Sequence, residues 1–300
     1  MSGNRTITVL SICLFVSSIS HAQSTHDFVL CNAVDKSGRH PAAVDSLKFS
    51  VEVHGRTVSN VHAEQRQRPR QIFLVQDVSA SMRDSNARQR SMQAVRDFAA
   101  SASPEDKLAL VDFNDSYFLD ITPESAPAFL EKYDDTEFQE GLRFFGGTAL
   151  FDAVIASASY LEKEPQEGDS VLVISDGADD ASKRNAEQME RELLRSKIRL
   201  YVLLLAPPKH PNPNDGRSRS QLMDVVRETG GVVVKADSGN VPSRHWAEVM
   251  HSLIEVADRV DFDLNTPLGS LARLDVLAST PDGKRDKAVE ISCPRYISPQ

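Results

Sequence analysis

One stretch constrains the fold more than any other: an apolar run of strand length, residues 71–76, is followed by Asp77, Ser79 and Ser81 and then by a helical pattern from Arg83. A strand that ends in oxygen-bearing side chains before a helix is typical of α/β proteins, in which ligands bind at the carboxyl ends of parallel strands. Three hard oxygen ligands so close together suit a divalent cation such as Mg²⁺, which keeps several waters and takes few protein carboxylates. The sequence therefore predicts a metal site, and its remaining ligands must come from elsewhere in the chain.

The region from Arg70 to Asp258 alternates short apolar runs with patterns of helical period. The apolar runs predict strands at residues 71–77, 108–113, 117–121, 170–175, 198–205 and 232–235. The helical patterns predict helices at residues 84–102, 123–133, 148–163, 181–196, 218–228 and 242–258. Repeated crossovers imply a parallel sheet covered by helices on both faces, and a tight turn makes residues 117–121 an antiparallel edge strand. We therefore predict the α/β fold class, with a doubly wound, mostly parallel six-stranded sheet.

Patterns typical of β-strands flank this region at both ends. Strands are predicted at residues 27–34, 47–53 and 57–63 before it, and at residues 260–264, 271–278 and 287–293 after it. The N-terminal segment (23–68) is too short to bury a core by itself. We therefore expect it to pair with the C-terminal segment (259–300) into one small β module. The α/β domain, residues 69–258, is then inserted between the two segments.

The N-terminus has the pattern of a signal peptide, residues 1–22. Arg5 supplies the positive charge, Ile7 to Ile19 form the apolar region, and Ser20-His21-Ala22 places small residues before a cleavage point at Gln23. The alternative is an N-terminal helix that stays attached. The signal peptide predicts export, to a periplasmic or extracellular location.

Two cysteines remain after the signal peptide, Cys31 and Cys293. In an oxidising compartment a lone pair is a candidate disulfide, and each cysteine lies on the apolar phase of its predicted strand. We therefore expect a Cys31–Cys293 bridge that staples the β module. Two separately buried thiols are the alternative, since cysteine is often an inert small hydrophobe.

The composition limits the classes of function. A net charge of -9 argues against a nucleic-acid partner, because phosphate binding needs a basic surface. No stretch is long enough to be a permanent membrane span. The motifs G-x-S-x-G, H-E-x-x-H, the P-loop and G-x-G-x-x-G after the first strand are all missing, so we do not expect an enzyme.

Two further oxygen-bearing side chains fall on the predicted rim of the sheet: Thr148 opens a helix after two glycines, and Asp176 ends a central strand. With Asp77, Ser79 and Ser81 they resemble the metal-ion-dependent adhesion site of the von Willebrand factor A (VWFA) domain, whose pattern is D-x-S-x-S, then a threonine, then an aspartate. The resemblance covers roughly residues 70–258, and this sequence matches the family's pattern at all five positions. Taken singly, the hydroxyls could be helix N-caps and Asp176 a turn residue, but caps and turns do not require this order on these elements.

The VWFA resemblance implies that Ser79 and Ser81 bind the ion directly, Thr148 directly or through water, and Asp77 and Asp176 largely through water. It also implies Mg²⁺, with Mn²⁺ or Ca²⁺ as alternatives, and a protein partner whose Glu or Asp carboxylate is the sixth ligand. The expected function is thus a secreted, metal-dependent protein-binding module, and the chain is similar in layout to secreted bacterial proteins with a VWFA-related domain. A VWFA scaffold whose metal is purely structural is the main alternative, and a metal-dependent hydrolase is less favoured.

Overall fold

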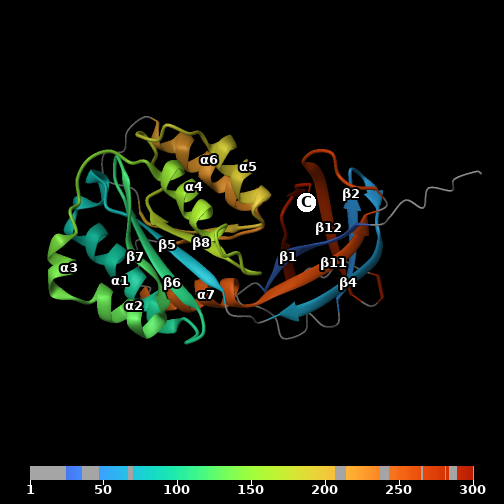
Figure 1. The fold of residues 1–300 in the computed structure, drawn as a ribbon, viewed down its shortest axis with the longest axis horizontal. Helices are drawn as coiled ribbons and strands as arrows, with labels where there is room; N and C mark the ends of the chain where they lie inside the picture. Colours follow the sequence, from blue (N-terminus) through green and yellow to red (C-terminus); the bar gives the residue numbers. More distant parts are fainter. Residues whose placement is uncertain are drawn as a thin grey trace, which may run out of the picture.

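The computed structural model describes residues 25–35, 47–66, 70–206, 214–236, 243–264, 266–280, 282–283 and 289–299. Two parts lie side by side along the long axis: an α/β part built on a mostly parallel sheet, and a β part formed by segments from both ends of the chain (Figure 1). The predicted fold class is therefore confirmed. The predicted signal peptide, residues 1–22, lies outside the described residues. Within the described ranges, no helix has the length and apolar character needed to cross a membrane.

Six strands form the sheet of the α/β part, in the order β10-β9-β8-β5-β6-β7. Their bounds are β5 Gln71–Asp77, β6 Lys107–Phe113, β7 Tyr117–Ser125, β8 Ser170–Ser175, β9 Arg199–Leu204 and β10 Val233–Lys235. Every neighbouring pair is parallel except β6 and β7, which are antiparallel. The carboxyl end of β5 therefore lies between those of β6 and β8, in the interior of the sheet.

Alternate residues of β5 enter two cores on opposite faces of the sheet, because successive side chains of a strand point to opposite sides. Ile72 and Leu74 belong to the core that includes residues of α1, α2 and α7. Phe73 and Val75 belong to the core with residues of α4, α5 and α6. A strand that is buried on both faces has a continuous apolar sequence, which explains why this stretch is so clear in the sequence.

Helices cover both faces of this sheet, in bounds close to those predicted. They are the 3-10 helix η2 Ala80–Arg83, α1 Ser85–Ser101, α2 Ala126–Tyr133, α3 Thr136–Gly141, α4 Leu150–Leu161, α5 Ala186–Arg195, α6 Asp215–Glu228 and α7 Ser243–Glu255. The helix predicted from residue 123 starts at Ala126, since residues 123–125 extend β7. α5 begins later than predicted, because Asn185 and Gln188 form a capping box that sets its first turn. The short helix α3 was not predicted.

The β part consists of two four-stranded sheets, in the orders β13-β1-β11-β4 and β14-β12-β2-β3. Their strands are β1 Thr25–Asp35, β2 Lys48–Val53, β3 Arg56–Thr57, β4 Ser59–Arg66, β11 Ala257–Leu264, β12 Ala272–Ser279, β13 Val289–Ser292 and β14 Tyr296–Ile297. Val29 and Val260 of the first sheet share one core with Val51 and Leu274 of the second, so the two sheets pack face to face. N-terminal and C-terminal segments thus pair into one β module, with β3 and β14 as strands that were not predicted.

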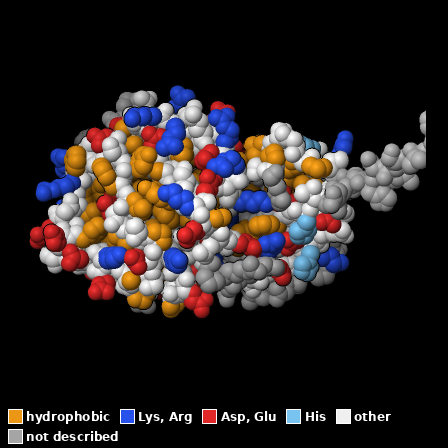
Figure 2. Space-filling model, viewed as in Figure 1, with side chains coloured by type: hydrophobic (Ala, Val, Ile, Leu, Met, Phe, Trp, Pro, Cys, Tyr) orange, Lys and Arg blue, Asp and Glu red, His pale blue; other side chains and the backbone are white. Residues whose placement is uncertain are grey.

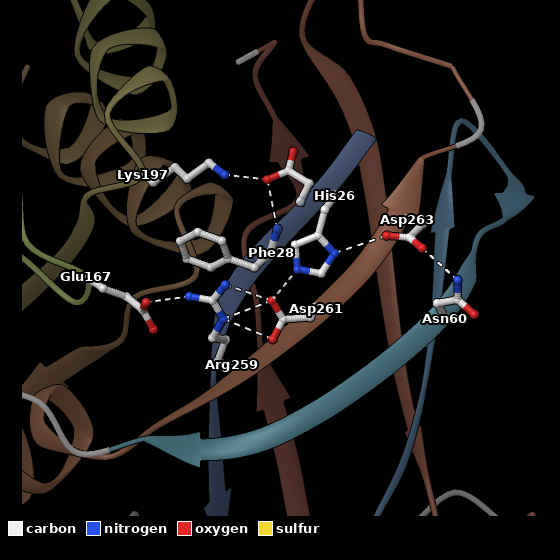
Figure 3. A network of polar contacts seen from close by, with 9 residues as sticks. His26, Phe28, Asn60, Glu167, Lys197, Arg259, Asp261 and Asp263 are labelled. Carbon is white, nitrogen blue, oxygen red and sulfur yellow. Dashed lines mark hydrogen bonds and ion pairs between the residues drawn. The ribbon is translucent and has the colours of Figure 1, made fainter. Parts of the chain in front are cut away.

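Polar contacts join the β module to the α/β part (Figure 3). Arg259 of β11 forms an ion pair with Glu167, which lies just before β8, and its guanidinium carbon lies 3.8 Å from the centre of the Phe28 ring. Lys197, between α5 and β9, forms an ion pair with the buried Asp27 of β1. Because both ion pairs cross between the two parts, they fix the β module against one end of the α/β part.

The Cys31–Cys293 disulfide is present, with the two Cα atoms 4.3 Å apart. The next residue, Pro294, forms an isolated β-bridge with Thr229 at the end of α6. A Cβ atom on Gly231, two residues further along this turn, would lie 1.8 Å from the carbonyl oxygen of Leu200. Only glycine permits this approach of two backbones, so the turn between α6 and β10 is closely packed next to the disulfide.

Candidate metal site

Three chain segments meet at the carboxyl end of the parallel sheet: the loop after β5, the loop before α4 and the loop after β8. The amide of Ala80 donates to the carbonyl of Gly146 at 3.1 Å, and the amide of Phe145 donates to the carbonyl of Val78 at 3.0 Å. These backbone hydrogen bonds hold the predicted D-x-S-x-S loop against the segment that carries Thr148. Residues far apart in the sequence are thereby brought to one rim of the sheet.

Asp77 is fully buried at the end of β5. Its Oδ2 accepts a hydrogen bond from the Ser175 hydroxyl at 2.6 Å, and its Oδ1 accepts one from the Ser79 amide at 2.9 Å. Burial, reinforced by the charge of Asp176, raises the pKa of Asp77 to about 7 in spite of these hydrogen bonds. A carboxylate that is costly to ionise in these surroundings would be stabilised by a nearby cation.

The Ser79 and Ser81 hydroxyl oxygens lie 3.0 Å apart. Ser79 is fully buried, whereas Ser81 is partly exposed. Ser79 occupies the N-cap position of η2, yet its side chain makes no capping hydrogen bond. The helix-capping interpretation therefore does not explain Ser79, and the two hydroxyls lie side by side.

Thr148 is buried in front of α4 and is held by Asp180. The Thr148 amide donates to Asp180 Oδ1 at 2.7 Å, and the Thr148 carbonyl accepts from the Asp180 amide at 3.0 Å. The N-cap of α4 is Ala149, so Thr148 is not the cap of that helix. A Cβ atom on Gly147 would lie 2.9 Å from Asp180 Oδ1, so glycine lets the aspartate approach the backbone.

Asp176 follows β8 and is almost completely buried. Its Oδ1 accepts from the Ala178 amide at 3.0 Å, which is an Asx-turn, so the turn interpretation holds for one of its two oxygens. The other oxygen, Oδ2, is buried and has no hydrogen-bond partner within the described part of the chain. A buried carboxylate oxygen without a donor is costly, and a cation or a water bound to one would satisfy it.

The donor set at this rim consists of two carboxylates and three hydroxyls. Hard oxygen donors of this kind fit Mg²⁺ and similar divalent ions. Among the residues that the structure describes, no group of three or more His, Cys, Asp or Glu side chains could hold a metal ion. A metal at this rim would therefore depend on hydroxyl oxygens and water as well as on the two carboxylates.

Two supporting residues at the rim were not identified from the sequence. Ser175 donates to Asp77, and Nε of Arg219 in α6 donates to the Asp176 carbonyl at 2.8 Å. Ser175 could have been found, because it is the last residue of a predicted strand whose end faces the site. Arg219 has no local signal, since it is 43 residues away from Asp176 in the sequence.

Comparisons with known proteins give one family and several distant structures. The family model described as "VWA domain containing CoxE-like protein" matches residues 32–229, a span that includes every residue predicted to bind the ion. A search of curated proteins found no match. An aerotolerance-related membrane protein from Bacteroides fragilis is 15% identical, with a TM-score of 0.47 over 62% of this chain and 98% of that chain. A von Willebrand factor type A protein from Catenulispora acidiphila is 10% identical, with a TM-score of 0.48 over 86% of this chain and 73% of that chain. The manganese-loaded TRAP protein from Plasmodium vivax is 13% identical, with a TM-score of 0.48 over 78% of this chain and 96% of that chain.

Proposed function

Because the chain belongs to the family of VWA domain containing CoxE-like proteins, we propose that it is an exported protein-binding module that depends on a divalent cation. Proteins with VWA domains often act as adhesion or interaction modules. The ion in this proposal is Mg²⁺, with Mn²⁺ or Ca²⁺ as alternatives. The partner is a protein that offers an exposed Glu or Asp carboxylate.

The buried Oδ2 of Asp176 is the observation that carries this proposal. No donor among the described residues contacts this oxygen, and the charge of Asp176 contributes to the raised pKa of the buried Asp77. Two such carboxylates would repel each other if both were ionised and nothing lay between them. A divalent cation at this rim would relieve that repulsion, and a water bound to the cation would satisfy the oxygen.

The proposed roles of the residues follow from their contacts. Ser79 and Ser81, whose hydroxyls lie side by side, would bind the ion directly, and Thr148 would bind it directly or through water. Asp77 and Asp176 would contribute mainly through water, each fixed by its own hydrogen bonds. The bound ion supplies a Lewis-acidic position for an external carboxylate oxygen, because few formal negative charges of the protein touch it.

Binding is proposed in preference to catalysis because the neighbours of the Ser79 hydroxyl are other candidate ligands of the ion. The Ser79 hydroxyl lies 3.0 Å from that of Ser81 and hydrogen-bonds the Asp77 carboxylate. The proposed export rests on the signal-peptide pattern of residues 1–22. The Cys31–Cys293 disulfide accords with export, because disulfides persist in oxidising compartments.

Calorimetric titration of Mg²⁺ into the metal-free protein tests the ion site. Ser79→Ala should abolish the binding, whereas the matched control Ser157→Ala should bind Mg²⁺ as the wild type does. Ser157 is also a buried serine, but its hydroxyl bonds the carbonyl of Ala153 within α4 at 2.9 Å. Undiminished Mg²⁺ binding by a folded Ser79→Ala variant would refute the proposed site.

Partner capture separates the binding module from a structural scaffold. The immobilised protein is exposed to proteins of the export compartment in Mg²⁺ or in EDTA. A binding module loses its partner in EDTA and in Ser79→Ala while it stays folded. A structural metal site predicts instead that EDTA leaves capture by the folded protein unchanged. A lower unfolding temperature in EDTA is expected in both cases, because an ion that binds the folded state stabilises it.

A further inference from the structure

Two arginines contact Phe144, which lies two residues before the first glycine of the candidate metal site, and a third arginine precedes it in the sequence. Nε of Arg83 donates to the Phe144 carbonyl at 3.2 Å. The guanidinium carbon of Arg88 lies 4.8 Å from the centre of the Phe144 ring. Arg143 is exposed, and its neighbours Leu142 and Phe144 are buried, so it projects outward from this segment. We call Arg83, Arg88 and Arg143 the arginine patch.

The arginine patch is not neutralised by carboxylates. None of its three guanidiniums has a carboxylate within 4.0 Å in the described part of the chain. Several other arginines do form ion pairs, namely the half-buried Arg96 of α1 with Asp134, Arg191 with Glu187 and Arg227 with Asp224, although the exposed Arg217 of α6 has no ion pair among the described residues either. On the face drawn in Figure 2, positive and negative side chains are likewise interspersed. Three arginines without a carboxylate partner among the described residues thus lie close together in a protein whose net charge is -9.

The nearest acid in sequence does not compensate the arginine patch. Asp84 directly follows Arg83, but its carboxylate accepts a hydrogen bond from the Asn86 amide at 2.9 Å. It thereby caps the N-terminus of α1, where the helix dipole stabilises its negative charge. The arginines consequently remain available to a partner.

The arginine patch adjoins the candidate metal site. Arg83 comes two residues after Ser81, and Phe145 next to the patch donates its amide to the carbonyl of Val78 in the D-x-S-x-S loop. Phe145 is 48% exposed. The exposed Tyr117 extends the same rim, because it pairs with the last residue of β6, whose other neighbour is Asp77. One surface thus combines the ion position, exposed aromatic rings and guanidiniums that no carboxylate of the described residues neutralises.

We propose that the arginine patch and the candidate metal site together bind an acidic segment of a partner protein, in which several Asp or Glu residues lie close together. One carboxylate binds the ion and others pair with the guanidiniums. This inference rests on the proposed function of the ion site and specifies the partner more closely. Guanidinium–carboxylate hydrogen bonds are charge-assisted, and a positive patch on an otherwise acidic protein steers an acidic segment to one place.

A fluorescein-labelled hexaglutamate peptide is the probe, and its binding is measured by fluorescence anisotropy in Mg²⁺ and in EDTA. Hexaglutamate should bind in Mg²⁺, and a hexaglutamine peptide should not. Arg143→Gln, which removes no hydrogen bond of the described residues, should weaken binding about two- to fivefold, as expected for one exposed charge. Arg83→Gln combined with Arg143→Gln should weaken it about tenfold and reduce its salt dependence. The control Arg191→Gln, on α5, should bind as the wild type does.

The outcomes separate this inference from the function on which it rests. If the arginine variants bind hexaglutamate as tightly as the wild type while Ser79→Ala does not bind, the acidic-segment proposal is wrong and the ion site stands. If the arginine variants weaken binding but EDTA and Ser79→Ala have no effect, the arginine patch binds acidic segments and the ion-dependent function is wrong. Failure of the wild type to bind hexaglutamate in Mg²⁺, or arginine-dependent binding only to phosphatidylserine vesicles, would also overturn the proposal.

Discussion

Replacing Asp77 with Asn should remove a large part of the pH dependence of stability in the metal-free protein. Burial, with the charge of Asp176, raises the pKa of Asp77 from 3.8 to about 7. A pKa that is higher in the folded than in the unfolded state means that the folded protein binds the proton more tightly. The resulting stabilisation is complete below the unfolded pKa and is lost as the pH rises through the folded pKa. The metal-free protein should therefore become less stable between about pH 4 and about pH 7.

The size of the effect follows from the two pKa values. A tenfold difference in proton affinity corresponds to about 1.4 kcal/mol, so the difference between 3.8 and about 7 corresponds to about 4 kcal/mol. About 3 kcal/mol of this loss falls between pH 5 and pH 8, where the unfolded carboxyl is already ionised. Burial also raises the pKa of Asp112 and Asp169, so the pH dependence of the whole protein has several sources. The difference between the wild type and Asp77→Asn isolates the contribution of Asp77.

Urea unfolding in EDTA at about pH 5 and about pH 8 measures this difference. The free energy of unfolding should fall between these pH values by about 3 kcal/mol more in the wild type than in Asp77→Asn. Asparagine keeps the shape of the side chain and an oxygen that can accept from Ser175 or from the Ser79 amide, but it does not ionise. Equal losses of stability in the two proteins would show that burial does not raise the pKa of Asp77, and the electrostatic description of the site would be wrong.

Three further predictions concern the disulfide of the β module, the close packing of the α6–β10 turn and the contact between the two parts. Replacing both Cys31 and Cys293 with Ser should lower the free energy of unfolding by up to about 5 kcal/mol, because the bridge spans 262 residues of sequence, and urea unfolding with and without reductant checks this. Gly231→Ala should lower the free energy of unfolding by about 3 kcal/mol or more, since its Cβ would overlap the Leu200 carbonyl. The matched control is Gly216→Ala in α6, whose Cβ meets nothing within 4 Å. This variant should change the free energy of unfolding by less than about 1 kcal/mol. Comparable urea midpoints for these two variants would contradict the close packing at the α6–β10 turn. Arg259→Leu should lower the free energy of unfolding by about 2 kcal/mol, because it removes the ion pairs with Glu167 and Asp261 and the contact with Phe28. Arg191→Leu on the exposed face of α5 should cost less than about 1 kcal/mol. If the two arginine variants lost similar amounts of free energy of unfolding, the contact of Arg259 with Glu167 would not be shielded from solvent.

Features with a local physical cause could be predicted from the sequence. A strand that is buried on both faces must be continuously apolar, and this property marked β5 and β8 without any knowledge of their neighbours. The predicted Cys31–Cys293 disulfide likewise followed from the strand phase of each cysteine and from the expected compartment. The predicted start of α2 at residue 123 is too early, because residues 123–125 belong to β7, which pairs with β6 through Glu124 and Ser125. That choice depends on a neighbouring strand, so the local sequence does not determine it.

The sequence by itself determined the alternation of strands and helices, the order of Asp77, Ser79, Ser81, Thr148 and Asp176 along the chain, and their places at the ends of strands and the starts of helices. Only the tertiary structure decided which atoms contact these residues. Ser175 donates to Asp77, Asp180 accepts from the amide of Thr148, and one oxygen of Asp176 has no partner among the described residues. The same is true of the arginine patch, whose members meet at Phe144 although about sixty residues separate Arg83 from Arg143. Strand and helix periods arise from the geometry of the local backbone and can be read from neighbouring residues. Hydrogen bonds, burial and uncompensated charge depend on which distant segments come into contact, and that is settled only when the sheet assembles.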